Sequence, residues 1–94
     1  MESWTVYILN CSDGSAYTGC TGNFERRLLQ HQAGEINFTK SIRPVTVLLK
    51  IVFYNKYKAF AFEKYLKSGS GRTFSNRHFR NVDAKKSFQL AGKP

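Results

Sequence analysis

Two runs of strand-forming residues, separated by a short turn, place the strongest limit on how this chain can fold. Residues 4–11 read Trp-Thr-Val-Tyr-Ile-Leu-Asn-Cys, and residues 15–21 begin directly after Asp13-Gly14. β-branched and aromatic runs joined by an Asp-Gly turn are typical of a β-hairpin. The sequence therefore predicts that the fold begins with two antiparallel strands.

The length of the turn decides which side chains share a face of this hairpin. A two-residue loop would point Tyr7 and Tyr17 to opposite faces. A three-residue loop would instead place Gly14 in a left-handed conformation and pair Leu9 with Tyr17. The two tyrosines would then share a face as diagonal neighbours, about 7–8 Å apart. The residues alone allow both registers.

Helix signals and one further strand follow the hairpin. The expected elements are a helix at residues 24–33, a strand at residues 45–53, a second helix at residues 55–67, and a short helix or turn at residues 72–80. Asn23 is a suitable cap for the first helix and Gly34 a suitable end. The third strand is strongly apolar, so we expect it to be covered on both faces. The Gly-rich segment at residues 68–71 is expected to end the second helix.

Charge and composition limit the class of function. The 94 residues suit one domain, and 15 Lys and Arg against 6 Asp and Glu give a net charge of +9. This balance favours polyanionic partners, nucleic acid before an anionic membrane. No apolar run approaches the roughly 18 residues of a membrane span, and the N-terminus lacks secretory features. Cys11 and Cys20 cannot form a disulfide framework or a C-x-x-C zinc site, so we expect reduced thiols and a cytoplasmic location.

Glu63 is the one acidic residue between Ile36 and Val82, a segment that holds ten Lys or Arg residues. One interpretation is an ion pair with Lys67, four residues later on the same helix. The other is a Mg²⁺ ligand, with phosphate oxygens and water completing the octahedron. The sequence weighs the two evenly. The scarcity of acids does exclude a two-metal site of the polymerase type.

Four other side chains carry candidate chemistry. Arg27 and His31 lie four residues apart on the first predicted helix, where they can bind a phosphate and transfer a proton. An ordinary amphipathic surface is the commoner role of such a pair. Tyr7 and Tyr17 are strand aromatics, which usually pack in a core. A catalytic phenol would have to lose its proton against an ordinary pKa of about 10, with help from nearby cations.

Together these residues resemble the GIY-YIG nuclease superfamily, over about residues 4–79. The motif positions are Thr5-Val6-Tyr7, Tyr17-Thr18-Gly19, Arg27 ten residues further on, His31 four beyond that, and Glu63 on the helix after the third strand. The likeness is greatest to small stand-alone members similar to the nuclease domain of the bacterial excision-repair endonuclease. It implies an α/β fold, with a three-stranded antiparallel sheet flanked by helices. We expect one such domain over residues 1–82 and a frayed tail over residues 83–94.

The resemblance also implies an activity: hydrolysis of DNA phosphodiester bonds with one divalent metal ion, Mg²⁺ or Mn²⁺, in DNA repair or recombination. By motif position, Glu63 would hold the metal. Tyr7 would be the leading general base for the attacking water, and Tyr17 would orient that water. Both phenols must then reach one site, which selects the three-residue loop and a positive φ at Gly14.

The remaining motif positions include two departures. Arg27 would stabilise charge on the phosphoryl oxygens, and His31 occupies a position where family members carry His or Tyr. Asn76 is the nearest match to a family Asn. Thr5 replaces the first Gly of the first motif. Cys20 stands where some repair-type members carry Lys, so activation of the phenols depends more on Arg27 and the metal.

Three functions are compatible with this sequence. The first is the metal-dependent endonuclease. The second is an inactive nucleic-acid-binding module that docks through Lys40, Arg43, Lys67, Arg72, Arg77 and Arg80. The third and weakest is a small protein that binds a ribonucleoprotein or another acidic partner. The endonuclease is favoured because a lone carboxylate repels phosphate unless a metal lies between them. The chain has no space for a separate DNA-binding element, so we expect DNA structure, a protein partner or a homodimer to select the site.

Overall fold

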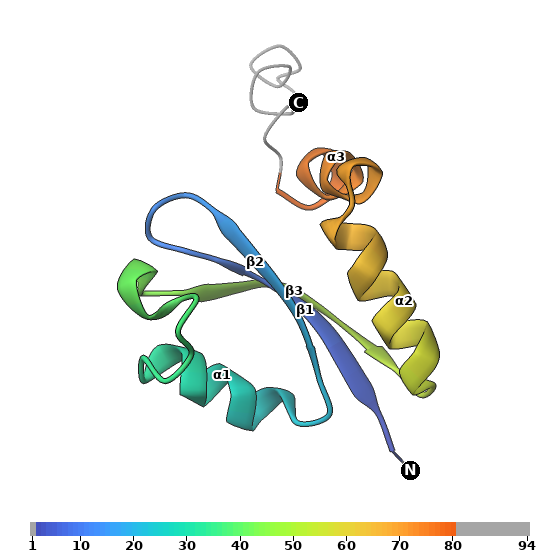
Figure 1. Cartoon of the computed structure of the whole chain (residues 1–94), viewed down its shortest axis with the longest axis horizontal. Helices are drawn as coiled ribbons and strands as arrows, with labels where there is room; N and C mark the ends of the chain where they lie inside the picture. Colours follow the sequence, from blue (N-terminus) through green and yellow to red (C-terminus); the bar gives the residue numbers. More distant parts are fainter. Residues whose placement is uncertain (1, 81–94) are drawn as a thin grey trace. The chain divides into compact units, whose positions relative to one another are not determined.

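A computed structural model describes residues 2–80, which form three strands and three α-helices (Figure 1). In chain order these are β1 (Trp4–Asn10), β2 (Ala16–Thr21), α1 (Phe24–Gln32), the 3₁₀ turn η1 (Lys40–Ile42), β3 (Thr46–Phe53), α2 (Lys56–Lys67) and α3 (Gly69–His78). The chain divides into two compact units, the first ending at Glu63 and the second starting at Lys64. Within residues 2–80, no helix is long and apolar enough to cross a membrane.

The sheet has β1 at its centre. Its strand order is β2-β1-β3, and both neighbouring pairs are antiparallel (Figure 1). The central strand is buried along nearly its whole length because it has a hydrogen-bonded neighbour on each side. This three-stranded antiparallel sheet with its helices confirms the predicted fold class.

The turn between β1 and β2 has the three-residue form. The Cys11 N–H donates to the Ser15 carbonyl at 2.9 Å, and Gly14 has a φ of +86°. Leu9 pairs with Tyr17 across the two strands. A residue with a side chain would be strained at the Gly14 position. The register that places both phenols on one face is therefore confirmed.

Helix α1 begins at Phe24 as predicted and ends at Gln32, one residue before the predicted end. The Asn23 side chain accepts a hydrogen bond from the Arg26 N–H at 3.1 Å, which satisfies one free donor of the first turn. Gly34 follows the helix with a φ of +80°. Phe24 is buried and Leu28 packs against the core, whereas Leu29 is 64% exposed and contributes little to the buried face.

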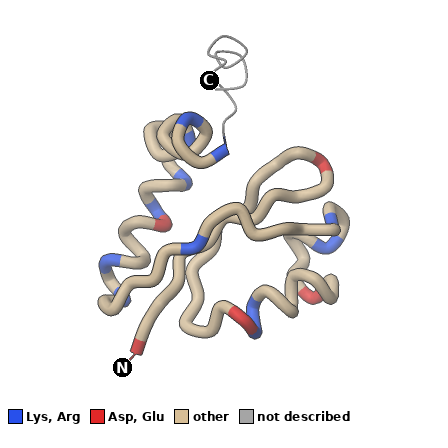
Figure 2. Tube along the Cα trace, turned by 180° about the vertical axis from the view of Figure 1, so that it is seen from behind, with Lys and Arg blue, Asp and Glu red and all other residues tan. Residues whose placement is uncertain are grey.

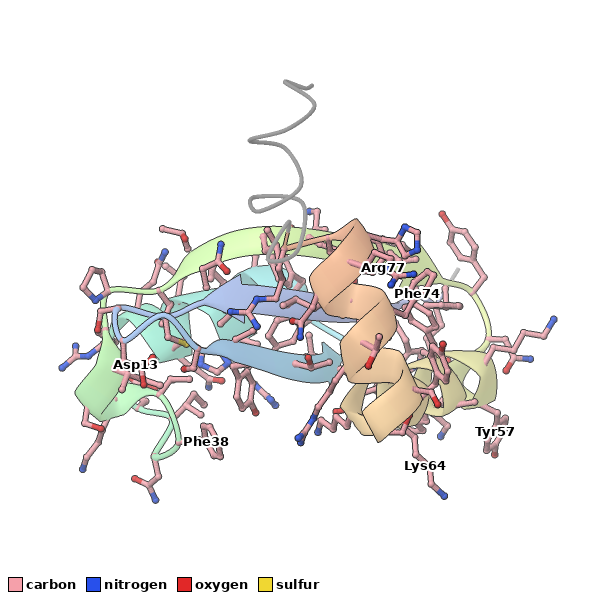
Figure 3. All side chains as sticks on the ribbon, turned by 90° about the horizontal axis from the view of Figure 1, so that it is seen from above. Asp13, Phe38, Tyr57, Lys64, Phe74 and Arg77 are labelled. Carbon is pink, nitrogen blue, oxygen red and sulfur yellow. The ribbon has the colours of Figure 1, made fainter. Side chains whose placement is uncertain are left out.

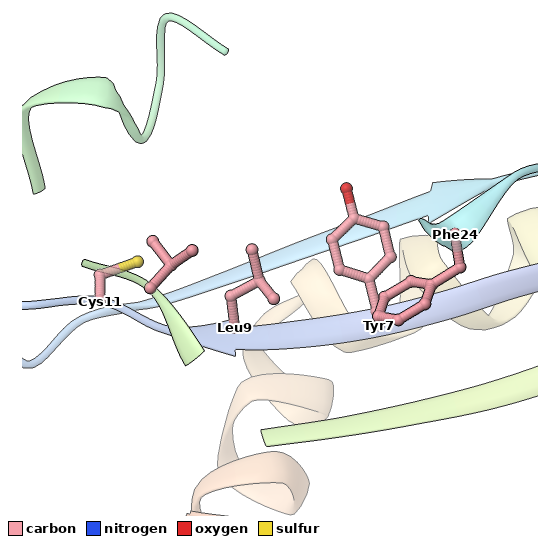
Figure 4. Packing of buried hydrophobic residues seen from close by; sticks show 5 residues of the cluster. Tyr7, Leu9, Cys11 and Phe24 are labelled. Carbon is pink, nitrogen blue, oxygen red and sulfur yellow. The ribbon is translucent and has the colours of Figure 1, made fainter. Parts of the chain in front are cut away.

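One face of β1 and helix α1 together enclose the main hydrophobic cluster (Figure 4). Its buried members are Tyr7, Leu9, Cys11, Phe24 and Val45. The β1 members lie at every second position, so they share one face of the sheet. The half-buried Tyr17 packs at the border of this cluster. The core and the candidate site thus share residues.

Strand β3 differs from its prediction. It begins at Thr46, and Val47 and Val52 are 41% and 46% exposed. The expectation of cover on both faces was wrong because β3 is an edge strand, paired only with β1. An apolar run by itself does not distinguish a central strand from an edge strand.

The first half of α2 packs on the sheet through aromatic contacts. The Asn55 side chain caps the helix by accepting from the N–H groups of Tyr57 and Lys58 at 2.9 and 3.0 Å. Aromatic rings then meet in two pairs, Trp4 with Phe60 at 5.4 Å and Phe53 with Phe62 at 5.6 Å between centroids. These contacts fix the helix turn that carries Glu63, which is half-buried.

In the second unit, α2 ends at Lys67, directly before the Gly-rich segment as predicted, and the next helix begins within that segment, at Gly69. The Ser68 hydroxyl accepts a hydrogen bond from the Gly71 N–H at 3.1 Å and so caps α3. A Cβ at Gly71 would collide with the backbone carbonyl of Tyr65, so only glycine allows this close approach. The predicted tail lies outside the described residues, and the single-domain boundary at residue 82 stays a prediction.

Candidate active site

The Tyr7 phenol lies at the centre of the candidate site. Tyr7 is 1% exposed in the middle of β1, and its ring meets the Phe24 ring edge-on at 5.5 Å (Figure 4). Gly19 of β2 is its cross-strand partner. A Cβ at Gly19 would collide with the Tyr7 hydroxyl. The glycine of the second motif is therefore needed to leave space for the phenol oxygen.

A chain of hydrogen bonds extends from this phenol into α1 and the segment beyond it. The Tyr7 hydroxyl lies 3.0 Å from His31 Nε2, and His31 Nδ1 lies 2.7 Å from the Thr39 hydroxyl. His31 and Thr39 are both 0% exposed. Buried polar groups are stable when paired in this way. His31 is thus an internal residue, and the interpretation of Arg27 and His31 as an ordinary helix surface was wrong for His31.

Tyr17 brings the second phenol to the same place. Its ring centroid lies 6.3 Å from that of Tyr7 and 5.0 Å from that of His31. Unlike Tyr7, it is half-buried. The Phe38 ring centroid lies 5.3 Å from that of Tyr17. Phe38 is 70% exposed and projects from the molecule (Figure 3). The shared face predicted for the two tyrosines is confirmed.

Two charged side chains influence the ionisation of these ring groups electrostatically. The Arg27 guanidinium is half-buried, and its Nε donates to the Gln30 side-chain oxygen at 3.2 Å. Its charge and a hydrogen bond favour the ionised form of Tyr7, and its charge also acts on His31. The Glu63 carboxylate acts on Tyr7 in the opposite sense. Strands β1 and β2 and helices α1 and α2 therefore contribute to one electrostatic environment around the Tyr7 oxygen.

Both buried ring groups have shifted pKa values. Burial, followed by the neighbouring Tyr17 phenol, raises the pKa of Tyr7 to about 12, although Arg27 opposes the shift. Burial and then the Arg27 charge lower the pKa of His31. At neutral pH the site therefore holds a neutral phenol beside a neutral imidazole.

The donor groups fit one hard divalent cation. Glu63 is the carboxylate that acts on Tyr7, and residues 2–80 contain no group of three His, Cys, Asp or Glu side chains able to hold a metal. Mg²⁺ is commonly held by one or two carboxylates together with water and substrate phosphate oxygens. A catalytic zinc site, by contrast, requires three protein ligands. The Glu63 carboxylate therefore suits a Mg²⁺ ion, for which it would be the protein ligand.

Comparison with known proteins agrees with this arrangement. The family model described as the GIY-YIG catalytic domain matches residues 3–78. The chain belongs to the GIY-YIG family. This confirms the resemblance drawn from the motif residues.

The relatives of this GIY-YIG chain include proteins named UPF0213. It is 43% identical over 63 residues to a UPF0213 protein of Cupriavidus pinatubonensis. The aligned segment covers 66% of this chain and 70% of the relative. It is 41% identical over 71 residues to one of Staphylococcus haemolyticus, covering 74% and 87%. The solution NMR structure of a UPF0213 protein of Bacillus halodurans matches with a TM-score of 0.53 and 27% identity, covering 90% and 95%.

The other predicted site residues of this GIY-YIG chain are divided between the two units. In the first unit, Lys40 and Arg43 are exposed. Arg43 donates to the Lys40 and Gln32 carbonyls at 3.0 and 3.2 Å, so it also ties down the end of α1. The second unit holds Asn76, whose side-chain oxygen accepts from Arg80 at 3.0 Å. It also holds Lys67, Arg72 and Arg77, among the basic positions seen along α2 and α3 in Figure 2.

Thr39 is the member of the polar chain that the sequence did not reveal. It lies in the basic loop after α1, eight residues from His31, and matches no helical or strand spacing to that residue. A polar residue in a loop is ordinary, so its presence there gives no sign of a buried contact. Only the fold, which returns this segment over α1, shows that its hydroxyl contacts the imidazole.

Proposed function

We propose that this GIY-YIG protein is a divalent-metal-dependent endonuclease that hydrolyses phosphodiester bonds in DNA. The observation that carries the proposal is the buried Tyr7 oxygen, 3.0 Å from His31 Nε2 and under the influence of both Arg27 and Glu63. A buried phenol oxygen that contacts a buried imidazole and has charged neighbours of both signs supports a reaction site over a simple core.

In this proposal Tyr7 is the general base. Once its own proton has passed to solvent, the phenolate oxygen takes a proton from the water that attacks phosphorus, while the bond from phosphorus to the leaving oxygen breaks and that oxygen takes a proton from solvent. A phenol with a pKa near 12 is a strong base once ionised, but it is protonated at neutral pH. Groups that favour the phenolate therefore control the rate. Arg27 is one of them, and the half-buried Tyr17 orients the water.

Arg27 and Glu63 act on the substrate in this proposal. The guanidinium stabilises the negative charge that develops on the phosphoryl oxygens. Glu63 would hold the metal ion, which when bound supplies charge neutralisation at the phosphate and lowers the pKa of nearby acids. Asn76 remains a candidate for a supporting contact.

Basic residues supply the affinity for DNA. The net charge of +9 favours phosphate contacts that are independent of sequence, and the binding constant is expected to fall steeply with salt. Lys40 and Arg43 from the first unit, with Lys67, Arg72 and Arg77 from the second, are the proposed phosphate-binding residues. Because these contacts carry no base readout, DNA structure or a partner would select the site.

The direct test of metal dependence compares Glu63→Gln with Glu35→Gln, which makes the same change at an exposed carboxylate. Labelled duplex, nicked, flapped and branched DNA are incubated with and without Mg²⁺ or Mn²⁺. We expect the wild type and Glu35→Gln to cleave at least one of these only with metal. Glu63→Gln should lose about 100-fold or more in rate while still binding DNA, because metal stabilisation of a phosphoryl transition state is large.

Two results would contradict the proposal. One is full activity in Glu63→Gln. The other is salt-dependent binding by the wild type without cleavage of any DNA in the panel, which would favour the inactive nucleic-acid-binding module.

A further inference from the structure

Phe38 exposes most of a large apolar ring to solvent at the edge of the candidate site. Its side chain is 70% exposed, although its ring contacts that of Tyr17. Single exposed apolar side chains are common on protein surfaces and need no function by themselves. The position of this ring is informative because Tyr17 also contacts the rings of His31 and Tyr7. A series of ring contacts therefore leads from the buried Tyr7, through the half-buried Tyr17, to the exposed Phe38.

The backbone that carries Phe38 is held in place. The next residue, Thr39, is fully buried, and its hydroxyl lies 2.7 Å from His31 Nδ1. The N–H groups of Thr39 and Lys40 both donate to the Ile36 carbonyl, at 3.1 and 3.0 Å, and close the turn that contains Phe38. An aromatic side chain on a fixed backbone loses little conformational freedom when a ligand covers it. Phe38 is thus a preorganised ring that can bind a flat apolar group.

The size and charge of this surface favour a nucleobase as that group. Residues 34–44 carry the exposed Lys40 and Arg43 against one acid, Glu35, in a chain with a net charge of +9. Proteins that bind single-stranded nucleic acid combine basic side chains for the phosphates with exposed rings on which bases stack. A protein partner would need a much larger contact area than one ring supplies. The face of one base, by contrast, matches the face of one phenyl ring.

We propose that Phe38 is a base-stacking residue, whose exposed ring binds an unpaired nucleobase of the substrate strand beside the phosphate that is cleaved. Within a duplex, neighbouring bases cover both faces of each base, so a side-chain ring can stack only on a base that has left the helix. The substrate class is therefore DNA with a single-stranded segment at the cleavage site. The place of the base beside that phosphate rests on the proposed nuclease function, whereas the stacking does not.

Binding in the absence of metal tests the stacking without any cleavage. The probes are a single-stranded oligonucleotide and a blunt duplex of the same sequence. Phe38→Ala removes the ring and Phe38→Trp keeps one, while Tyr57→Ala removes an exposed ring from α2 as the control. We expect Phe38→Ala to bind the single strand about 5-fold to 100-fold more weakly, the range for loss of one stacked base. Its affinity for the duplex should be unchanged, and Phe38→Trp and Tyr57→Ala should bind both probes like the wild type.

The Phe38→Trp variant also reports stacking directly, because the fluorescence of an indole falls when a base stacks on it. The wild type, whose tryptophan is Trp4, supplies the background. We expect the single-stranded oligonucleotide to quench the added tryptophan beyond this background, and the blunt duplex to leave it unquenched. Equal quenching by both probes would contradict the choice of an unpaired base.

Three binding results would overturn the stacking proposal. They are an unchanged affinity of Phe38→Ala for the single strand, an equal loss for single strand and duplex, and a loss in Tyr57→Ala as large as that in Phe38→Ala. The first would leave Phe38 as an ordinary exposed side chain, and the second would assign it a general contact with the DNA backbone.

Cleavage of flapped and blunt duplex DNA with Mg²⁺ then tests where the base lies. We expect the wild type to prefer the flapped DNA and Phe38→Ala to lose that preference. Retention of the full preference by Phe38→Ala would contradict the placement of the stacked base beside the cleaved phosphate. If the wild type binds the single strand through Phe38 but cleaves no DNA, the nuclease proposal fails while the stacking proposal stands.

Discussion

Strands β1 and β3 have similar sequences but different environments. Both are mostly apolar, yet five consecutive residues of β1 are buried, whereas every residue of β3 is either exposed or half-buried. β1 has a neighbour on each side and β3 only one. The position of a strand in the sheet, which depends on contacts far apart in the chain, therefore decides how much of its apolar surface is buried.

The same difference explains why the candidate site is built on β1. A catalytic phenol needs a rigid setting and neighbours that shift its pKa, and the central strand supplies both. Tyr7 is fixed between Gly19 and Phe24, with His31 at its hydroxyl. Beyond the end of β3, Tyr54 and Tyr57 are 70% and 75% exposed. Figure 3 shows Tyr57 projecting from α2. An exposed tyrosine on a strand or helix therefore lacks the rigid, charged surroundings that a catalytic phenol needs.

The sharpest stability contrast comes from one change made in both strands. Val6→Ala removes two buried carbons from β1 and should lower the free energy of unfolding by about 2–3 kcal/mol. Val47→Ala in β3 should cost less than about 1 kcal/mol, because Val47 is 41% exposed and Val6 only 1%. Urea unfolding of both variants measures the difference. Equal losses would mean that β3 is as well covered as β1.

A second contrast compares two glycines. Gly19→Ala would force the buried Tyr7 ring away from its place, so we expect a loss of about 1–3 kcal/mol in the free energy of unfolding, together with disruption of the bond to His31. Gly22→Ala meets Trp4 at 3.5 Å, an ordinary contact, and should be tolerated. Thermal unfolding and the His31 NMR signals report the two effects. If the His31 signals of Gly19→Ala were unchanged, the methyl group would not have displaced the Tyr7 ring. That result would contradict the tight packing of Tyr7 against Gly19.

The smallest expected effect is a pH dependence of stability. The folded state lowers the pKa of His31, so the unfolded chain binds its proton more readily than the folded chain. The free energy of unfolding should therefore decrease as pH falls below about 6.5, the ordinary pKa of histidine. Urea unfolding between pH 7.5 and 5 measures this. His31→Gln should flatten the dependence.

Local signals were enough to predict much of the first unit. Asn23 and Gly34 mark the ends of α1, because capping and left-handed conformations depend on a few neighbouring residues. The three-residue turn followed once both tyrosines were required to share a face. The motif positions brought together Tyr7, Tyr17 and His31, with Arg27 and Glu63 acting on them.

Features set by packing between elements could not be predicted. The exposure of β3 depends on strand order. The helix that begins at Gly69 depends on a close approach of Gly71 to the Tyr65 carbonyl, where glycines more often signal a break. Thr39 depends on the path of a loop. In each case the residue type is compatible with several environments, and only the packing selects one.

The most direct test of the account is single-turnover cleavage of the labelled DNA panel with Mg²⁺ by Tyr7→Phe and Tyr57→Phe. Each variant removes one phenolic oxygen, from a buried position in β1 or from an exposed one in α2. We predict that Tyr57→Phe keeps the wild-type rate, whereas Tyr7→Phe loses about 100-fold or more, as expected for a general base, with DNA affinity unchanged. Cleavage by Tyr7→Phe at the wild-type rate would contradict the claim that the Tyr7 oxygen takes the proton from water.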